Sequence, residues 1–197
     1  MKRAEIVYRE ILYRVIEEKE RKLTQSELSK KLEISLSIVN SAVRKLSELG
    51  AVKILQRSFS VIDVKKALYF WASIRNLKKD IIFSGRIDLS VRDIERSMPN
   101  DIIYTAYSAY KFRFKDVPAD YSEIYVYASD DGIKNIRKRL VIKENIRPNL
   151  FVLKKDNLIS KYKEIPIAQI FVDLWNLREW YAKEFVDALE KKIKEVS

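Results

Sequence analysis

The chain has 197 residues, of which 47% are hydrophobic and 34% are charged, so it can bury a core and form one domain or two small ones. Histidine and cysteine are both absent. Their absence excludes Ser-His and Cys-His nucleophile pairs, disulfides, and zinc sites built on thiolate or imidazole ligands. Only three glycines occur, too few for the glycine-rich loops that hold phosphates. The function classes that remain are carboxylate chemistry with a hard cation, lysine chemistry, and binding without catalysis.

The net charge is +11, which indicates a polyanionic partner, either nucleic acid or an acidic membrane surface. Residues 1–75 carry 16 Lys and Arg against 9 acidic residues, so the smaller N-terminal part holds most of the excess. No run of 18 apolar residues is present, and the N-terminus leads into an amphipathic segment instead of a signal peptide. We therefore expect a soluble, cytoplasmic protein that does not act at a membrane.

Apolar spacing in the first part of the chain predicts helices that are separated by turns, with a β-hairpin before the last helix. Thr24 and Asp63 are expected to cap helices, and Gly50 to supply a left-handed residue after a helix. The polar stretch 76–80 predicts a domain boundary, which divides the chain into residues 1–77 and 78–197. The expected elements are helices over 3–18, 24–33, 35–49 and 64–77, and strands over 51–55 and 59–62.

The second part mixes helices and strands, which predicts an α+β domain and an α+β protein overall. Residues 130–132, Asp-Asp-Gly, are expected to form a turn. The expected elements are extended chain over 80–88, 111–115, 122–128 and 149–153, and helices over 90–98, 101–110, 168–177 and 179–196.

The order of elements over residues 24–62 resembles the winged helix-turn-helix family. Within the helix 35–49, we expect Ile38, Ala42, Val43, Leu46 and Leu49 to face the core, which leaves small polar side chains and one arginine on the opposite stripe. Such a stripe can approach base edges in the major groove of double-stranded DNA, and a basic hairpin tip can reach phosphates or the minor groove. The candidate DNA-binding residues are Ser35, Ser37, Asn40, Ser41, Arg44, Lys45, Gln56 and Arg57.

Two other interpretations of this stripe stay open. Asn40 and the serines are also the residue types of an ordinary solvated face, and some winged helices bind proteins instead of DNA. The basic excess of the N-terminal part favours DNA.

Segments 100–110, 120–127, 165–174 and 180–189 follow the winged helix in an order that resembles the AbiEi family of transcriptional regulators. These are antitoxins of type IV toxin–antitoxin and phage-defence systems. The resemblance implies a repressor of its own operon that opposes a nucleotidyltransferase toxin without a stable complex. The alternative function is a winged-helix transcription factor whose second domain senses a ligand or a partner.

The second domain also faintly resembles a nucleotidyltransferase core, which makes a nucleotidyltransferase-like enzyme the third hypothesis. That chemistry needs two carboxylates two residues apart on one strand to hold magnesium. Here the strand begins Glu123-Ile124-Tyr125, so the second carboxylate is missing. We therefore expect a degenerate, inactive fold with no catalytic residues, no metal and no cofactor.

Two basic segments of the second domain carry alternative interpretations. Residues 111–115 interleave bases and aromatics, which is typical of single-strand binding. An alternating strand with its aromatics in the core explains the same pattern, and we favour it. The cluster of Arg137, Lys138 and Arg139 within residues 134–143 is either a second DNA contact or a solvated face.

Overall fold

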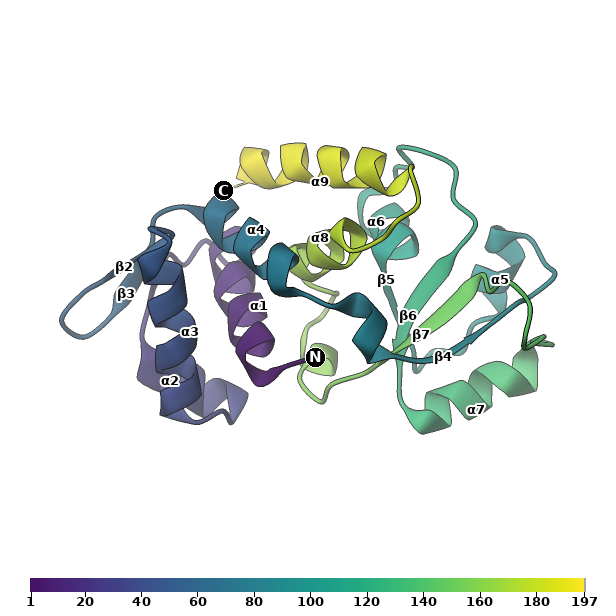
Figure 1. Ribbon diagram of the computed structural model, residues 1–197, viewed down its shortest axis with the longest axis horizontal. Helices are drawn as coiled ribbons and strands as arrows, with labels where there is room; N and C mark the ends of the chain where they lie inside the picture. The colour runs from purple at the N-terminus through teal and green to yellow at the C-terminus, as the bar shows by residue number, and fades with distance from the viewer. Residues whose placement is uncertain (197) are drawn as a thin grey trace. The chain divides into compact units, whose positions relative to one another are not determined.

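The computed structural model describes residues 1–196 of the chain (Figure 1). Over these residues it contains nine α-helices, two short 3-10 helices and two β-sheets, which confirms the α+β class. The chain divides into two compact units. The first contains Met1–Arg75, Pro166–Val172 and the chain from Glu190 onward, and the second contains Asn76–Ile165 and Asp173–Leu189.

The second unit begins at Asn76, two residues before the predicted start of the second domain. The first unit also includes two later segments of the chain. That residues 1–77 form an independent domain stays a prediction. None of the helices within residues 1–196 combines the length and the apolar composition that crossing a membrane requires.

The first unit contains a group of packed helices and, at its edge, a small antiparallel sheet with strand order β1-β3-β2 (Figure 1). Helix α1 contacts α2, α3 and α4, and α2 contacts α3. The elements of its N-terminal segment are α1 (Arg3–Ile16), β1 (Lys22–Leu23), α2 (Gln25–Leu32), α3 (Leu36–Glu48), β2 (Val52–Ile54), β3 (Phe59–Val61) and α4 (Val64–Ile74).

Local signals set the ends of these helices as predicted. The Thr24 hydroxyl accepts the Glu27 amide at 3.2 Å, and the Asp63 carboxylate accepts the Lys66 amide at 2.9 Å. Each bond satisfies an amide that the first helical turn leaves without an intrahelical partner. Gly50 has a φ of +70°, a conformation that glycine adopts without steric cost.

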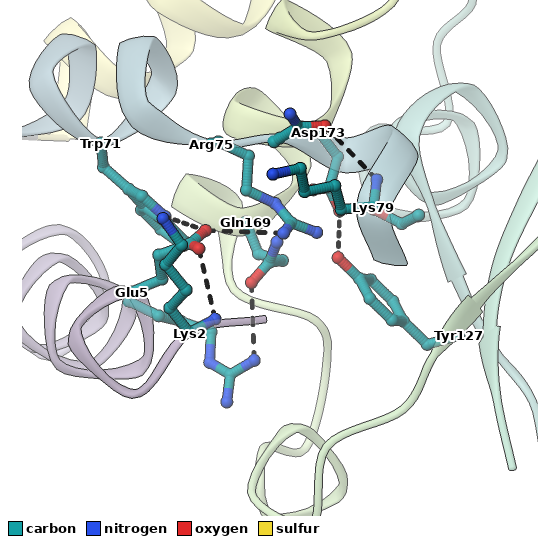
Figure 2. Close-up of polar contacts among 11 residues, drawn as sticks. Lys2, Glu5, Trp71, Arg75, Lys79, Tyr127, Gln169 and Asp173 are labelled. Carbon is teal, nitrogen blue, oxygen red and sulfur yellow. Dashed lines mark hydrogen bonds and ion pairs between the residues drawn. The ribbon is translucent and has the colours of Figure 1, made fainter. Parts of the chain in front are cut away.

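A buried polar cluster joins α1 to α4 (Figure 2). The Glu5 carboxylate accepts hydrogen bonds from Trp71 Nε1 at 3.3 Å and from Arg75 Nη1 at 3.5 Å. On the next turn of α1, Arg9 Nη1 donates to Oε1 of Gln169 at 3.5 Å. These bonds compensate the cost of burying charged groups beside an apolar core.

The second unit contains a four-stranded mixed sheet with strand order β4-β7-β6-β5. Strands β6 and β7 are parallel with α7 between them in the chain, and the two edge strands pair antiparallel. The elements are η1 (Leu77–Asp80), β4 (Ile81–Gly85), α5 (Val91–Ser97), β5 (Ile103–Thr105), α6 (Ala106–Phe114), β6 (Ile124–Ala128), α7 (Asp130–Arg139), β7 (Leu150–Lys154) and η2 (Ile159–Lys161).

Two further helices, α8 (Ile167–Trp175) and α9 (Ala182–Val196), contribute residues to each unit. In the second unit, the buried Asp173 carboxylate accepts hydrogen bonds from Thr105 Oγ1 at 2.7 Å and Tyr127 Oη at 2.6 Å (Figure 2). These bonds join the end of α8 to β5 and β6.

Three predictions for the second part are wrong. Residues 101–110 are not one helix, because Ile103–Thr105 pairs with β6 as a strand. Residues 111–115 are not a strand, because they belong to α6 and the residue after it, in a helix that buries Tyr107 and Tyr110 on one side. Residues 130–132 are not a turn but the start of α7, where the Ser129 hydroxyl accepts the Gly132 amide at 3.2 Å.

Candidate nucleic-acid interface

Helix α3 has one buried face and one exposed face, because its apolar residues recur at helical spacing. Val39, Ala42, Val43 and Leu46 are buried. Two expected core positions differ: Ile38 is only half-buried, and Leu49 is 44% exposed. Leu49 follows the last helical residue, so its side chain leaves the line of the buried stripe. Val39 takes the core position instead.

All eight candidate DNA-binding residues are exposed. At about 100° per residue, Ser37, Ser41 and Arg44 lie opposite the buried stripe of α3. Asn40 and Lys45 lie on the two flanks of that face, and Ser35 precedes the helix as its N-cap residue. That these side chains contact DNA stays a prediction.

A hydrogen bond from α2 holds the Asn40 side chain. Its Nδ2 donates to Oε1 of Gln25 at 3.0 Å. Gln25 is the first residue of α2, so the bond connects the starts of the two adjacent helices. An asparagine held in this way keeps its amide in one orientation, as reading an adenine edge requires. Gln25 is not among the residues predicted from the sequence.

Arg44 forms an ion pair within its own helix. Its Nε lies 3.0 Å from Oε1 of Glu48, and the two side chains are 74% and 60% exposed. Such an exposed pair contributes only about 0.3–0.5 kcal/mol, so a nucleic acid can compete for the guanidinium. Glu48 is not among the residues predicted from the sequence, although its spacing of four residues from Arg44 is a signal for such a pair.

Gln56 and Arg57 occupy the loop between β2 and β3, which projects beyond the helices of the first unit (Figure 1). The Leu55 amide donates to the Ser58 carbonyl at 2.8 Å and closes the base of this loop. Both side chains are exposed, so the loop presents an arginine and an amide at its tip.

The three-stranded sheet adds two lysines that the sequence analysis did not select. Ser60 of β3 is directly opposite Lys22 of β1 on one side and Lys53 of β2 on the other. Directly opposed residues share one face of a sheet, so both exposed lysines extend from the same face. Strand β1 has only two residues, and its pairing with β3 is not visible in the local sequence pattern.

In the second unit, Glu123 is buried and hydrogen-bonded to hydroxyl groups. Ser122 Oγ donates to Glu123 Oε1 at 3.2 Å, and Tyr181 Oη donates to Glu123 Oε2. Burial, then the hydrogen bond to Glu123, raises the pKa of Tyr181 to about 12, so Tyr181 remains a donor at neutral pH. Within residues 1–196, no group of three or more acidic residues is placed to hold a metal ion.

The two basic segments of the second unit are engaged with neighbouring groups. Lys111 Nζ lies 2.5 Å from Glu95 Oε2, and Arg113 Nη1 donates to the Ile165 carbonyl at 3.0 Å. In α7, Arg137 pairs with Glu144 at 2.5 Å, whereas Arg139 donates to the Met98 carbonyl at 3.2 Å. The contacts of Lys111 and Arg113 support packing roles. Arg137 and Glu144 are 48% and 51% exposed, so both interpretations of the basic cluster in α7 stay open.

Comparison of the chain with protein-family models, with curated proteins and with solved structures finds no match.

Proposed function

We propose that the chain is a sequence-specific transcriptional regulator that binds double-stranded DNA through a winged helix-turn-helix in its first unit. The observation that carries the proposal is the exposed face of α3, where small polar side chains surround one arginine. The order of elements, the projecting β2–β3 loop and the basic excess of residues 1–75 also support it.

In this proposal, α3 enters the major groove with its N-terminal half against the bases. Ser37 and Ser41 are small enough to allow close approach. Asn40 contacts adenine and Arg44 contacts guanine, since their side chains match the hydrogen-bonding edges of those bases. Gln56 and Arg57 contact phosphates or the minor groove beside the helix.

The test uses the full chain and two fluorescent duplexes, one from the region upstream of its own coding sequence and one of shuffled sequence. We expect tighter binding to the upstream duplex, with an affinity that falls steeply as salt increases. Arg57→Ala is expected to weaken both complexes alike, and the exposed Arg92→Ala of α5 to change neither. No binding at low salt, or equal affinity for the two duplexes, contradicts the proposal.

We further propose that the regulator is an antitoxin that represses its own operon and opposes a nucleotidyltransferase toxin without catalysis of its own. The support is the resemblance of its later segments to the AbiEi family. The test places the full chain and the gene next to it under separate promoters in one cell. Growth arrest by the neighbour that the full chain relieves, without co-purification of the two proteins, is expected. A harmless neighbour argues against this role.

A further inference from the structure

The first unit contains a hollow of about 440 Å³ beside the proposed DNA-reading helix. Its walls come from the start of α1, the end of α3 and the second half of α4. The lining includes Ala4, Tyr8, Lys45, Leu49, Phe70 and Ile74.

Apolar side chains form much of this wall, and two of them are incompletely covered by the protein. Leu49 is 44% exposed and Ile74 is 41% exposed. The rings of Tyr8 and Phe70 meet edge to face, with 5.5 Å between their centroids. Exposed apolar groups around a concave surface are typical of a site for a small apolar ligand.

The charged side chains of the wall favour an anion. Glu5 is bonded to Trp71 and Arg75, and Glu48 is paired with Arg44, so each of the two acids has a cationic partner. Lys45 is exposed, and no carboxylate pairs with it in the part of the chain whose side chains are described. An anionic ligand therefore has a cation to bind at the rim of the hollow.

The Tyr8 hydroxyl provides an independent observation. Tyr8 is fully buried, and its Oη has no hydrogen-bond partner among the described residues. A buried hydroxyl without a partner destabilises the ligand-free protein, and a ligand that supplies an acceptor removes this penalty. Burial, and then the charge of Glu5, raises the pKa of Tyr8 to about 12, so the hydroxyl keeps its proton at neutral pH.

We infer that this hollow binds a small amphipathic anion, an apolar ring or chain that carries one carboxylate, sulfonate or phosphate group. The apolar body packs on Phe70 and Ile74, and the anionic group pairs with Lys45. Because Lys45 lies on α3, the bound anion competes with DNA phosphates for this side chain, and the ligand weakens DNA binding. This regulatory part rests on the proposed function, whereas the binding site itself does not.

The first experiment tests the site without DNA. The full chain is titrated calorimetrically with anilinonaphthalene sulfonate, which joins an apolar body to one anionic group. We expect saturable one-to-one binding that Lys45→Ala weakens about fivefold and that Ala4→Phe, which fills the hollow, weakens about tenfold. The exposed Lys191→Ala, on helix α9, serves as the matched control and is expected to bind as the wild type does.

Tyr8→Phe separates a ligand contact from a packing role. Removal of the unpartnered hydroxyl is expected to raise the melting temperature of the ligand-free protein and to weaken the sulfonate about threefold. Absence of binding to the wild type, or unchanged binding to both Lys45→Ala and Ala4→Phe, overturns the site. Weaker binding without the change in melting temperature still supports contact with Tyr8.

The second experiment adds the upstream duplex at low salt. Saturating sulfonate is expected to weaken the DNA complex about threefold, through loss of one phosphate contact. Unchanged DNA affinity in the presence of bound sulfonate overturns the regulatory part. If the sulfonate binds but no duplex does, the proposed function fails and the anion site stands.

Discussion

Arg44, the arginine that we expect to contact a base, is bound to a carboxylate one turn further along its own helix. The exposed pair is weak, so DNA can take the guanidinium at little cost. Glu48 nevertheless places a negative charge on the face that we propose for DNA, where phosphates would repel it. In the proposed complex, we expect Glu48 to lower the affinity for DNA.

Glu48→Gln is therefore expected to strengthen binding to any duplex by about two- to tenfold at low salt, because it frees Arg44 and removes a repulsive charge. Fluorescence anisotropy with upstream and shuffled duplexes measures the change. Glu184→Gln, an exposed acid of α9, is the matched control. Binding that is unchanged or weaker in Glu48→Gln shows that α3 does not face the nucleic acid as proposed.

At the scale of elements, the three-stranded sheet brings Lys22 and Lys53 to one face although 30 residues separate them in the chain. Each phosphate contact contributes about 0.9 to the slope of log affinity against log salt. The double variant Lys22→Ala, Lys53→Ala is expected to reduce that slope by about 2 on upstream and shuffled duplexes alike. The control is Lys163→Ala combined with Lys191→Ala, and an unchanged slope removes this sheet face from the interface.

Elements whose ends depend on adjacent residues could be predicted from the sequence. Thr24 and Asp63 cap helices as expected, and Gly50 takes the left-handed conformation. These signals act over three or four residues, so the sequence contains them in full.

Elements that depend on distant contacts could not be predicted in the same way. Strand β1 exists through its pairing with Phe59 and Ser60. The alternation of residues 111–115 favours a strand, yet the chain is helical there, and Tyr107 of the same helix packs against Phe185, with 5.0 Å between the ring centroids. In the candidate site, the exposure of α3 follows from its periodicity, whereas the Asn40–Gln25 bond requires the packing of two helices.

At the scale of the whole molecule, the first unit is completed by the end of the chain. Lys65 Nζ lies 2.6 Å from Glu190 Oε1, and Tyr69 Oη donates to Glu190 Oε2 at 2.8 Å. The pKa of Glu190 is lowered to about 2, and the hydrogen bond from Lys65 is the largest cause. Because the pKa of Glu190 is lower in the folded protein than the unfolded value of 4.5, its carboxylate stabilises the folded state above pH 4.5. This contribution is lost as the pH falls from 4.5 toward 2.

Glu190→Gln is therefore expected to reduce the free energy of unfolding by about 1–2 kcal/mol at pH 7, a value that allows for solvent screening of the partly exposed pair. The difference from the wild type should shrink as pH falls below about 4. Urea denaturation across this pH range measures it, with Glu184→Gln as the control. A difference that is the same at every pH means that lost packing, not the ion pair, explains the effect.

The central claim is that α3 reads DNA sequence, and the specificity of Arg44→Ala tests it most directly. Affinities of the wild type and the variant for the upstream and the shuffled duplex are measured at one salt concentration. We expect a loss on the order of 1–3 kcal/mol on the upstream duplex and a much smaller loss on the shuffled one, so that the ratio of the two affinities falls. An unchanged ratio, whatever the affinities, would contradict it.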